Sequence, residues 1–158
     1  MARGEQRAAA RLAAVQALYQ MEVARKGLNE IFAEFESHWI GQEVEGDQYR
    51  PAEIAFFRNI LQGVLDHQTA IDKMTDEALQ AGWPLRRVEA VLRAILRCGT
   101  YELMRRGDVP ARVVITEYAD LAAAFFDREE VGLVNGVLDG LAHTLRSDEF
   151  EPRRQTPA

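Results

Sequence analysis

Three arginines stand at helical spacing near the start of the sequence, since Arg3, Arg7 and Arg11 are each four residues apart. The surrounding stretch EQRAAARLAAVQALYQ (5–20) is rich in alanine, which predicts a helix with the arginines in one row. Arginine combines a fixed charge with a planar face, so such a row could bind phosphates or stack on bases. The row has a second interpretation, in which it is the solvated rim of the helix and pairs with Glu5.

Other residue types that carry chemistry are scattered. His38, His67 and His143 lie far apart, and the sequence contains no HxxxH pair and no CxxC pair, so a metal site is not expected. It also lacks the GxxxxGK[ST] and GxGxxG loops that bind nucleotide phosphates. Cys98 lies in an apolar segment and is interpreted as a small buried hydrophobe. The sequence therefore predicts neither an enzyme nor a cofactor.

Composition limits the class of protein. The 158 residues suffice for one domain with a core, and 47% of them are hydrophobic. The net charge of -6 argues against nonspecific coating of nucleic acid, but it allows a local basic patch. The single cysteine excludes an intrachain disulfide, and no apolar run approaches 18 residues. We expect a cytoplasmic protein that does not span a membrane.

Helical periodicity recurs along the chain, with glycine and proline between the segments. Six or seven helices and no strand are expected. The first three cover about 5–26, about 29–40 and a segment that begins at 51, and the fourth ends near Gly82 with Thr69 or Thr75 as its cap. The others cover 84–106, a segment that begins at 111 and a last segment that runs through Leu145. The loop 41–51 and a mobile tail from about Ser147 complete the chain. On the first helix the expected buried face is Ala8, Leu12, Val15, Tyr19 and Val23.

Five segments carry a resemblance to a known family. They are AVQALYQ (14–20), FFRNILQGV (56–64), WPLRRV (83–88), ILRCGTYELMRRGDVPARVVITEYADLA (95–122) and LVNGVLDGLA (133–142). In this order, and together with the arginines before them, they resemble the bacterial transcription antitermination factors of the NusB family. The match spans residues 7–142, nearly the whole chain.

The resemblance implies an all-helical fold of two packed three-helix bundles. A single domain 1–146 would contain one bundle at about 5–75 and another at 84–146, followed by a mobile tail, 147–158. Its core would rest on Leu12, Val15, Phe57, Leu61, Leu96, Leu121 and Leu138.

The implied activity is binding. With NusE, a small-subunit ribosomal protein, the family captures boxA RNA in the transcription elongation complex and promotes processive transcription of ribosomal RNA operons. No cofactor is implied.

The resemblance also suggests site residues. Arg3, Arg7 and Arg11 would meet RNA phosphates or splayed bases. Tyr19 lies on the expected apolar face, and its hydroxyl could reach the protein partner. Asn135 has two interpretations, RNA binding or packing, while Gly136 within an apolar helix suggests close helix packing.

Two departures from the family pattern weaken individual contacts. Where the family often has a basic residue and phenylalanine near the RNA, this chain has Gly132 and Leu133, and Arg128 is the candidate substitute. Where the family often has a carboxylate near the protein interface, this chain has Leu92, and Glu89 one turn earlier is the candidate replacement.

Two rival functions stay open at the level of sequence. One is a fragment of an RNA cytosine methyltransferase that carries a NusB-like domain. The other is a helical protein-interaction or self-associating module that binds no RNA. A homodimer would hide the RNA surface, and the sequence does not decide between monomer and dimer.

Overall fold

The computed structural model describes residues 3–40, 50–79 and 88–151, except for the side chains of 3–5, 38–40 and 50–53. The described residues form helices and no strand, which confirms the all-α prediction. The helices are α1 (Arg3–Ala24), α2 (Leu28–Ile40), α3 (Arg50–Asp66), α4 (Gln68–Ala78), α5 (Ala90–Arg105), α6 (Ala111–Ala123), α7 (Arg128–Leu145) and the single turn α8 (Ser147–Phe150). Most of the expected loop 41–51, the WPLRRV segment up to residue 87 and the tail from 152 lie outside the described residues.

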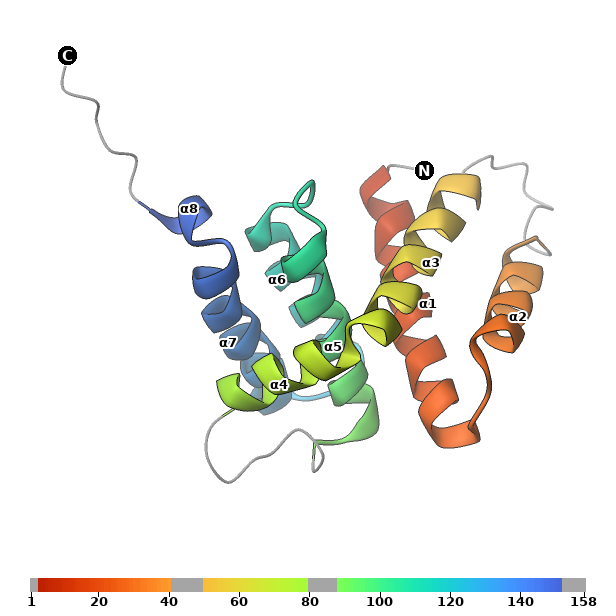
Figure 1. Cartoon of the computed structure of the whole chain (residues 1–158), viewed down its shortest axis with the longest axis horizontal. Coiled ribbons are helices and arrows are strands. Elements are labelled where there is room, and N and C mark those ends of the chain that lie inside the picture. Colours follow the sequence, from red (N-terminus) through yellow and green to blue (C-terminus); the bar gives the residue numbers. More distant parts are fainter. Residues whose placement is uncertain (1–2, 41–49, 80–87, 152–158) are drawn as a thin grey trace, which may run out of the picture.

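The helices pack as two neighbouring groups that meet along α5 (Figure 1). In the first group α1 lies against α3, and α2 packs on both. In the second group α5, α6 and α7 contact one another. The helix α4, part of the expected first bundle, packs against α5 and α7 instead. The division into two bundles near residue 75 stays a prediction.

The helix α1 turns a different face to the core from the one expected. Its buried side is made of small residues, Ala10, Ala13, Ala14 and Ala17, with Val15 and Leu18 beside them. Leu12, Tyr19 and Val23 are 37%, 36% and 59% exposed, so placing these three in the core was wrong. The reason is that α1 packs against both α3 and α5, and alanine lets both neighbours approach closely.

The rest of the expected core is largely confirmed. Val15, Phe57, Leu61, Leu96 and Leu138 are fully buried, and Leu121 packs partly buried against them.

Several helix ends differ from expectation, among them the end of α4 at Ala78 rather than near Gly82 and the start of α5 at Ala90 rather than at 84. The helix α1 ends before Arg25, whose φ of 55° is left-handed, rather than at Gly27. Thr75 does not cap α4; it is buried inside the helix, and its hydroxyl donates to the Ile71 carbonyl at 2.7 Å. The residues after Arg146 begin with α8 and pack Phe150 against the core, so the expected tail starts later than Ser147.

Candidate nucleic-acid interface

Arg7 lies in the first turns of α1 and points toward the turn that joins α5 to α6. Its guanidinium carbon is 4.6 Å from the centre of the Phe56 ring, and its Nη2 is 3.5 Å from Asp108. The side chain is 21% exposed, so Arg7 reaches the surface as expected. Arg3 begins the same helix, but its side chain is not among the described ones.

Arg11 is not at the rim. The residue is 2% exposed, and its guanidinium donates two hydrogen bonds to the Glu102 carboxylate at 2.8 and 3.0 Å. The hydroxyl of the buried Tyr118 donates to the same carboxylate. The prediction that Arg11 is accessible to RNA is therefore wrong. Four residues after Arg7, it has turned into the contact with α5, where its charge neutralises that of Glu102.

A third arginine, which sequence reasoning missed, joins Arg7 on the surface. Arg106 follows α5 and donates to both carboxylate oxygens of Asp108 at 3.0 and 2.8 Å, and to Asn59 Oδ1 at 3.3 Å. Its guanidinium carbon is 5.0 Å from the centre of the Phe56 ring. Arg7, Arg11 and Arg106 therefore all lie around one phenyl ring that is itself 4% exposed. The signal was present in the RRGDVP segment, which places arginine beside a turn.

This turn is fastened from the far end of the chain. The buried Arg146 donates to the carbonyls of Glu102, Leu103, Arg106 and Val109 at 2.7 to 3.0 Å. The Glu102 carbonyl also accepts from the backbone N–H of Arg106 at 2.9 Å, so Arg146 adds a second donor at the end of α5. Glu149 accepts from Arg146 at 2.6 Å and from the backbone N–H of Ala111 at 2.9 Å. Residues 146–149 thus tie the end of α5 to the start of α6.

The remaining expected RNA residues lie elsewhere. Arg128 begins α7 and is exposed, and Asn135 is exposed two turns later, so neither is buried by packing. The helix α7 has 18 residues, a length of about 27 Å at 1.5 Å per residue, and its far end reaches the turn beside Arg7. Arg7 and Arg128 are therefore not one patch. Gly136 is also exposed, and an added Cβ would meet nothing within 4 Å, so its expected close packing is wrong.

Close packing instead occurs at two other glycines. A Cβ added at Gly63 would be 2.1 Å from the Tyr101 ring, and one at Gly99 would be 2.7 Å from Leu138. Gly63 allows Tyr101 on α5 to lie against α3, where its hydroxyl donates to Asn59 Oδ1 at 3.0 Å.

The residues suggested for the protein partner lie near the other end of α1. Leu12, Tyr19 and Val23 form an exposed apolar row, here called the α1 stripe. An ion pair between Glu22 and Arg93 joins this end of α1 to α5. Glu89 is exposed, and its carboxylate caps α5 by accepting from the N–H groups of Val91 and Leu92 at 3.1 and 3.3 Å. Glu89 thus has a structural role whether or not it meets a partner.

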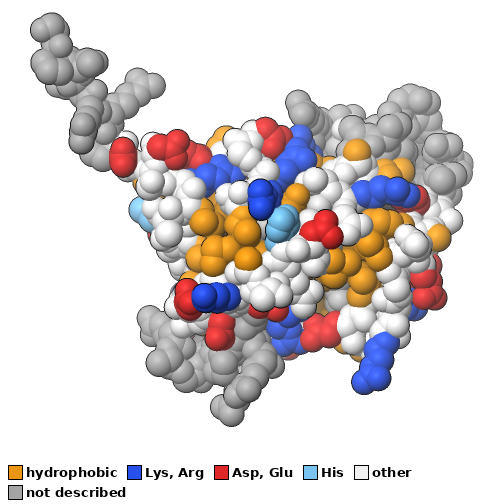
Figure 2. Space-filling view, viewed as in Figure 1, with side chains coloured by type: hydrophobic (Ala, Val, Ile, Leu, Met, Phe, Trp, Pro, Cys, Tyr) orange, Lys and Arg blue, Asp and Glu red, His pale blue; other side chains and the backbone are white. Residues whose placement is uncertain are grey.

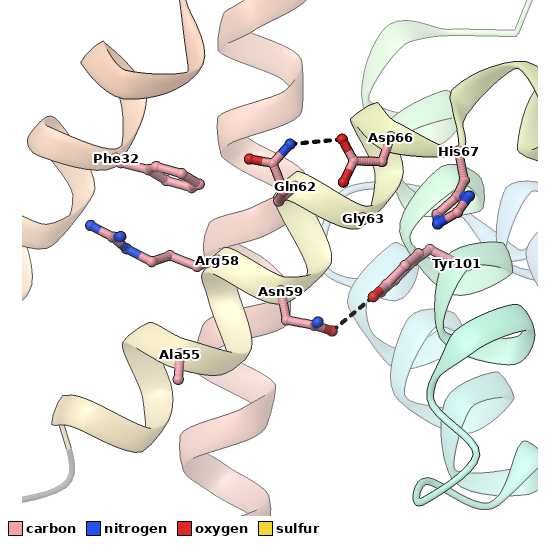
Figure 3. Close-up of a pocket in the computed structure, with 9 residues that line it drawn as sticks. All are labelled: Phe32, Ala55, Arg58, Asn59, Gln62, Gly63, Asp66, His67 and Tyr101. Carbon is pink, nitrogen blue, oxygen red and sulfur yellow. Dashed lines mark hydrogen bonds between the residues drawn. The ribbon is translucent and has the colours of Figure 1, made fainter.

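A groove of about 480 Å³ lies where α2, α3 and α5 meet. Figure 3 shows its lining: Phe32, Ala55, Arg58, Asn59, Gln62, Gly63, Asp66, His67 and Tyr101. Its polar groups largely satisfy one another, as Asn59 accepts from Tyr101 and Gln62 donates to Asp66 at 2.9 Å. On the face in Figure 2, hydrophobic side chains gather between α2 and α3, and again near α4 and α7.

Among the described residues, no group of three or more His, Cys, Asp or Glu side chains could hold a metal ion. Cys98 is fully buried, and burial raises the pKa of its thiol well above the ordinary value, so it stays a protonated packing group at neutral pH. Within the described ranges, no helix combines the length and apolarity needed to cross a membrane.

The described helices bring Arg7 of α1 and Arg106 after α5 to one phenyl ring and expose an apolar row on α1, which is typical of a binding module. Its fold matches those of solved NusB structures. NusB from T. maritima is 29% identical with a TM-score of 0.76, covering 92% of this chain and 97% of that one. A chain from the crystal structure of antitermination factors NusB and NusE in complex with dsRNA has a TM-score of 0.73 at 23% identity, with 91% and 99% covered, and shares the fold.

Sequence comparison identifies the family. The model of the NusB family matches residues 8–143. The transcription antitermination protein NusB of Bradyrhizobium diazoefficiens is 62% identical over 148 residues, which cover 94% of this chain and 90% of the relative. That of Nitrobacter hamburgensis is 60% identical over 148 residues, covering 94% and 92%. The chain belongs to the NusB family, which confirms the resemblance found in the sequence.

Proposed function

We propose that this protein is a cytoplasmic, RNA-binding transcription antitermination factor that captures boxA RNA together with NusE in the transcription elongation complex. The observation that carries the proposal is the convergence of Arg7 and Arg106 on Phe56 beside the α5–α6 turn. It supplies a local cationic surface in a chain of net charge -6. Arginines held on an aromatic ring offer charge and a planar face to single-stranded RNA.

The α1 stripe is the proposed docking surface for NusE, with Tyr19 at its centre. Exposed large apolar side chains in a row are typical of protein contact sites. Arg128 and Asn135 are proposed as a second RNA contact, reached by a strand that extends along the molecule from Arg7. Contacts this sparse give weak binding by the protein alone and tighter binding when NusE shares the RNA.

The test is a titration of labelled boxA RNA and of a scrambled RNA, each with and without NusE. The proposal expects tight binding only for boxA in the presence of NusE. Equal affinity for both RNAs under both conditions would contradict it. An Arg7→Ala variant should weaken boxA binding and reduce the slope of log affinity against log salt by about 0.7 for each phosphate that is no longer neutralised. Lys73→Ala, which removes an exposed charge on α4, is the matched control.

A second candidate function is a protein-interaction or self-associating module without RNA binding. The observation that favours it is that Asp108 already pairs with both Arg106 and Arg7. Sedimentation of the free protein would show whether a homodimer forms. Loss of that dimer in Tyr19→Ser, with no RNA binding in either state, would support this candidate.

A further inference from the structure

The carboxylate of Asp108 lies between two guanidinium groups. Arg106 donates two hydrogen bonds to it, at 3.0 and 2.8 Å, and Arg7 Nη2 is 3.5 Å away. The two arginine side chains are 21% and 22% exposed, whereas that of Asp108 is 52% exposed. The anion is thus the most accessible member of the cluster and the one that solvent or a ligand meets first.

A carboxylate held in this way resembles a bound phosphate. Guanidinium groups bind carboxylate and phosphate oxygens with the same paired geometry. Phe56 supports both guanidiniums, with centroid distances of 4.6 and 5.0 Å, so little side-chain freedom is lost when the anion changes.

Access to the cluster is open on one side. A hollow of about 410 Å³ beside it is lined by Arg7, Arg11, Asp108, Val109, Pro110, Val113 and Glu117. Glu117 Oε2 is 3.9 Å from Arg11 Nη1, so a second carboxylate also faces this hollow. An anion that enters this hollow therefore meets Arg7 beside the resident negative charge of Asp108 and Glu117.

We propose that Asp108 is a built-in competitor for RNA phosphate, which holds Arg7 and Arg106 in place and is displaced from Arg7 when an RNA backbone binds. Arg106 is then a further RNA-contacting residue. This inference rests on the proposed function. It gives a physical reason for weak binding by the protein alone, because every phosphate bound at Arg7 must first replace an ion pair.

The experiment is an RNA titration with Asp108→Asn, which keeps the shape of the side chain and removes its charge. With NusE present, the affinity for boxA RNA and for a scrambled single strand should each rise by about two- to fivefold, the size of one partly exposed ion pair. The gain should be larger at low salt. It should disappear when Arg7→Ala is added, because the arginine for which the two anions compete is then absent. Glu77→Gln removes the same charge at an exposed site on α4 and should leave affinity unchanged.

Unchanged or reduced RNA affinity in Asp108→Asn, with thermal unfolding like that of the unaltered protein, would overturn the inference. If Asp108→Asn lowers the unfolding temperature, the second variant Asp108→Ser must still raise the affinity for RNA. If neither variant raises the affinity, the inference is overturned. A gain with scrambled RNA but no preference for boxA would reject the proposed function and keep the inference. A preference for boxA that is unaffected by the Asp108 substitutions would reject the inference alone. If no form of the protein binds RNA, the inference and the proposed function are both rejected.

Discussion

Arg11 and Glu102, separated by 91 positions in the sequence, pair through two hydrogen bonds inside the contact between α1 and α5. Glu102 is fully buried, and Tyr118 donates a further hydrogen bond to it. A buried ion pair with satisfied hydrogen bonds adds little net stability, but removing one partner leaves an uncompensated charge. The pair therefore fixes how α1 sits on α5, and through that where Arg7 lies.

We predict that Arg11→Ala destabilises the fold by about 3–5 kcal/mol, the usual cost of stripping one partner from a buried pair. Urea unfolding monitored by circular dichroism measures this loss. The double variant Arg11→Met with Glu102→Leu should recover much of it, because no charge remains buried. A loss below about 0.5 kcal/mol in Arg11→Ala would show that Glu102 finds another partner.

The α1 stripe predicts a separation of stability from partner binding. Tyr19→Ser should leave the free energy of unfolding within about 0.5 kcal/mol of the original, because Tyr19 is 36% exposed and outside the core. If Tyr19 is an interface anchor, the affinity of this variant for NusE should fall at least tenfold, which is about 1.4 kcal/mol. Calorimetry without RNA measures this affinity. Phe125→Ser changes a similarly exposed aromatic at the end of α6 and should have no effect on NusE. Equal losses in both variants would argue against a docking site on α1.

Two glycines should respond to alanine with opposite signs. Gly63→Ala places a methyl group 2.1 Å from the Tyr101 ring, so we expect a loss of about 1–3 kcal/mol from overpacking. Gly136→Ala meets nothing within 4 Å on an exposed helix surface, so we expect a gain of about 0.5–1 kcal/mol from helix propensity. Chemical denaturation of the two variants side by side tests both. Destabilisation by Gly136→Ala would mean that this face is covered.

Acid should weaken the clamp at residues 146–149, which is the set of contacts that ties the end of α5 to the start of α6. The hydrogen bond from the Ala111 N–H, followed by that from Arg146, holds the pKa of Glu149 below its ordinary value of 4.5. A carboxylate with a lowered folded-state pKa stabilises the fold above its ordinary pKa, and this contribution is lost as pH falls through the folded value. Glu149→Gln should therefore be less stable at pH 7 and lose less on acidification. Midpoints of urea unfolding measured between pH 7 and pH 3 test this, with Asp148→Asn as the neighbouring control. If the midpoints of Glu149→Gln and of the unaltered protein fall in parallel with pH, the prediction is contradicted.

The helices and the family order could be predicted because periodicity and motif order are local properties of the sequence. The rotation of α1 could not. That helix carries a row of large apolar residues and a row of alanines, and periodicity gives more weight to large side chains. Packing favoured the alanine side, since two neighbours approach it closely.

The site was predictable only in part, because some of its contacts join residues that are far apart in the sequence. Arg7 follows from its spacing, but the burial of Arg11 depends on Glu102, which no local pattern indicates. The separation of Arg7 from Arg128 depends on the direction in which α7 runs. Glu89 is the candidate replacement for the carboxylate missing at Leu92, and its place directly before α5 also makes it a helix cap.

The clamp formed by Arg146 and Glu149 has a consequence for synthesis on the ribosome. The turn with Arg106 and Asp108 is made about forty residues before the groups that fasten it, since Arg146 and Arg106 are 40 positions apart. A nascent chain that has already folded α1, α3 and α5 still lacks the contacts to Ala111 and Val109. The surface around Asp108 is therefore completed only after residues 146–149 have been synthesised and have left the exit tunnel.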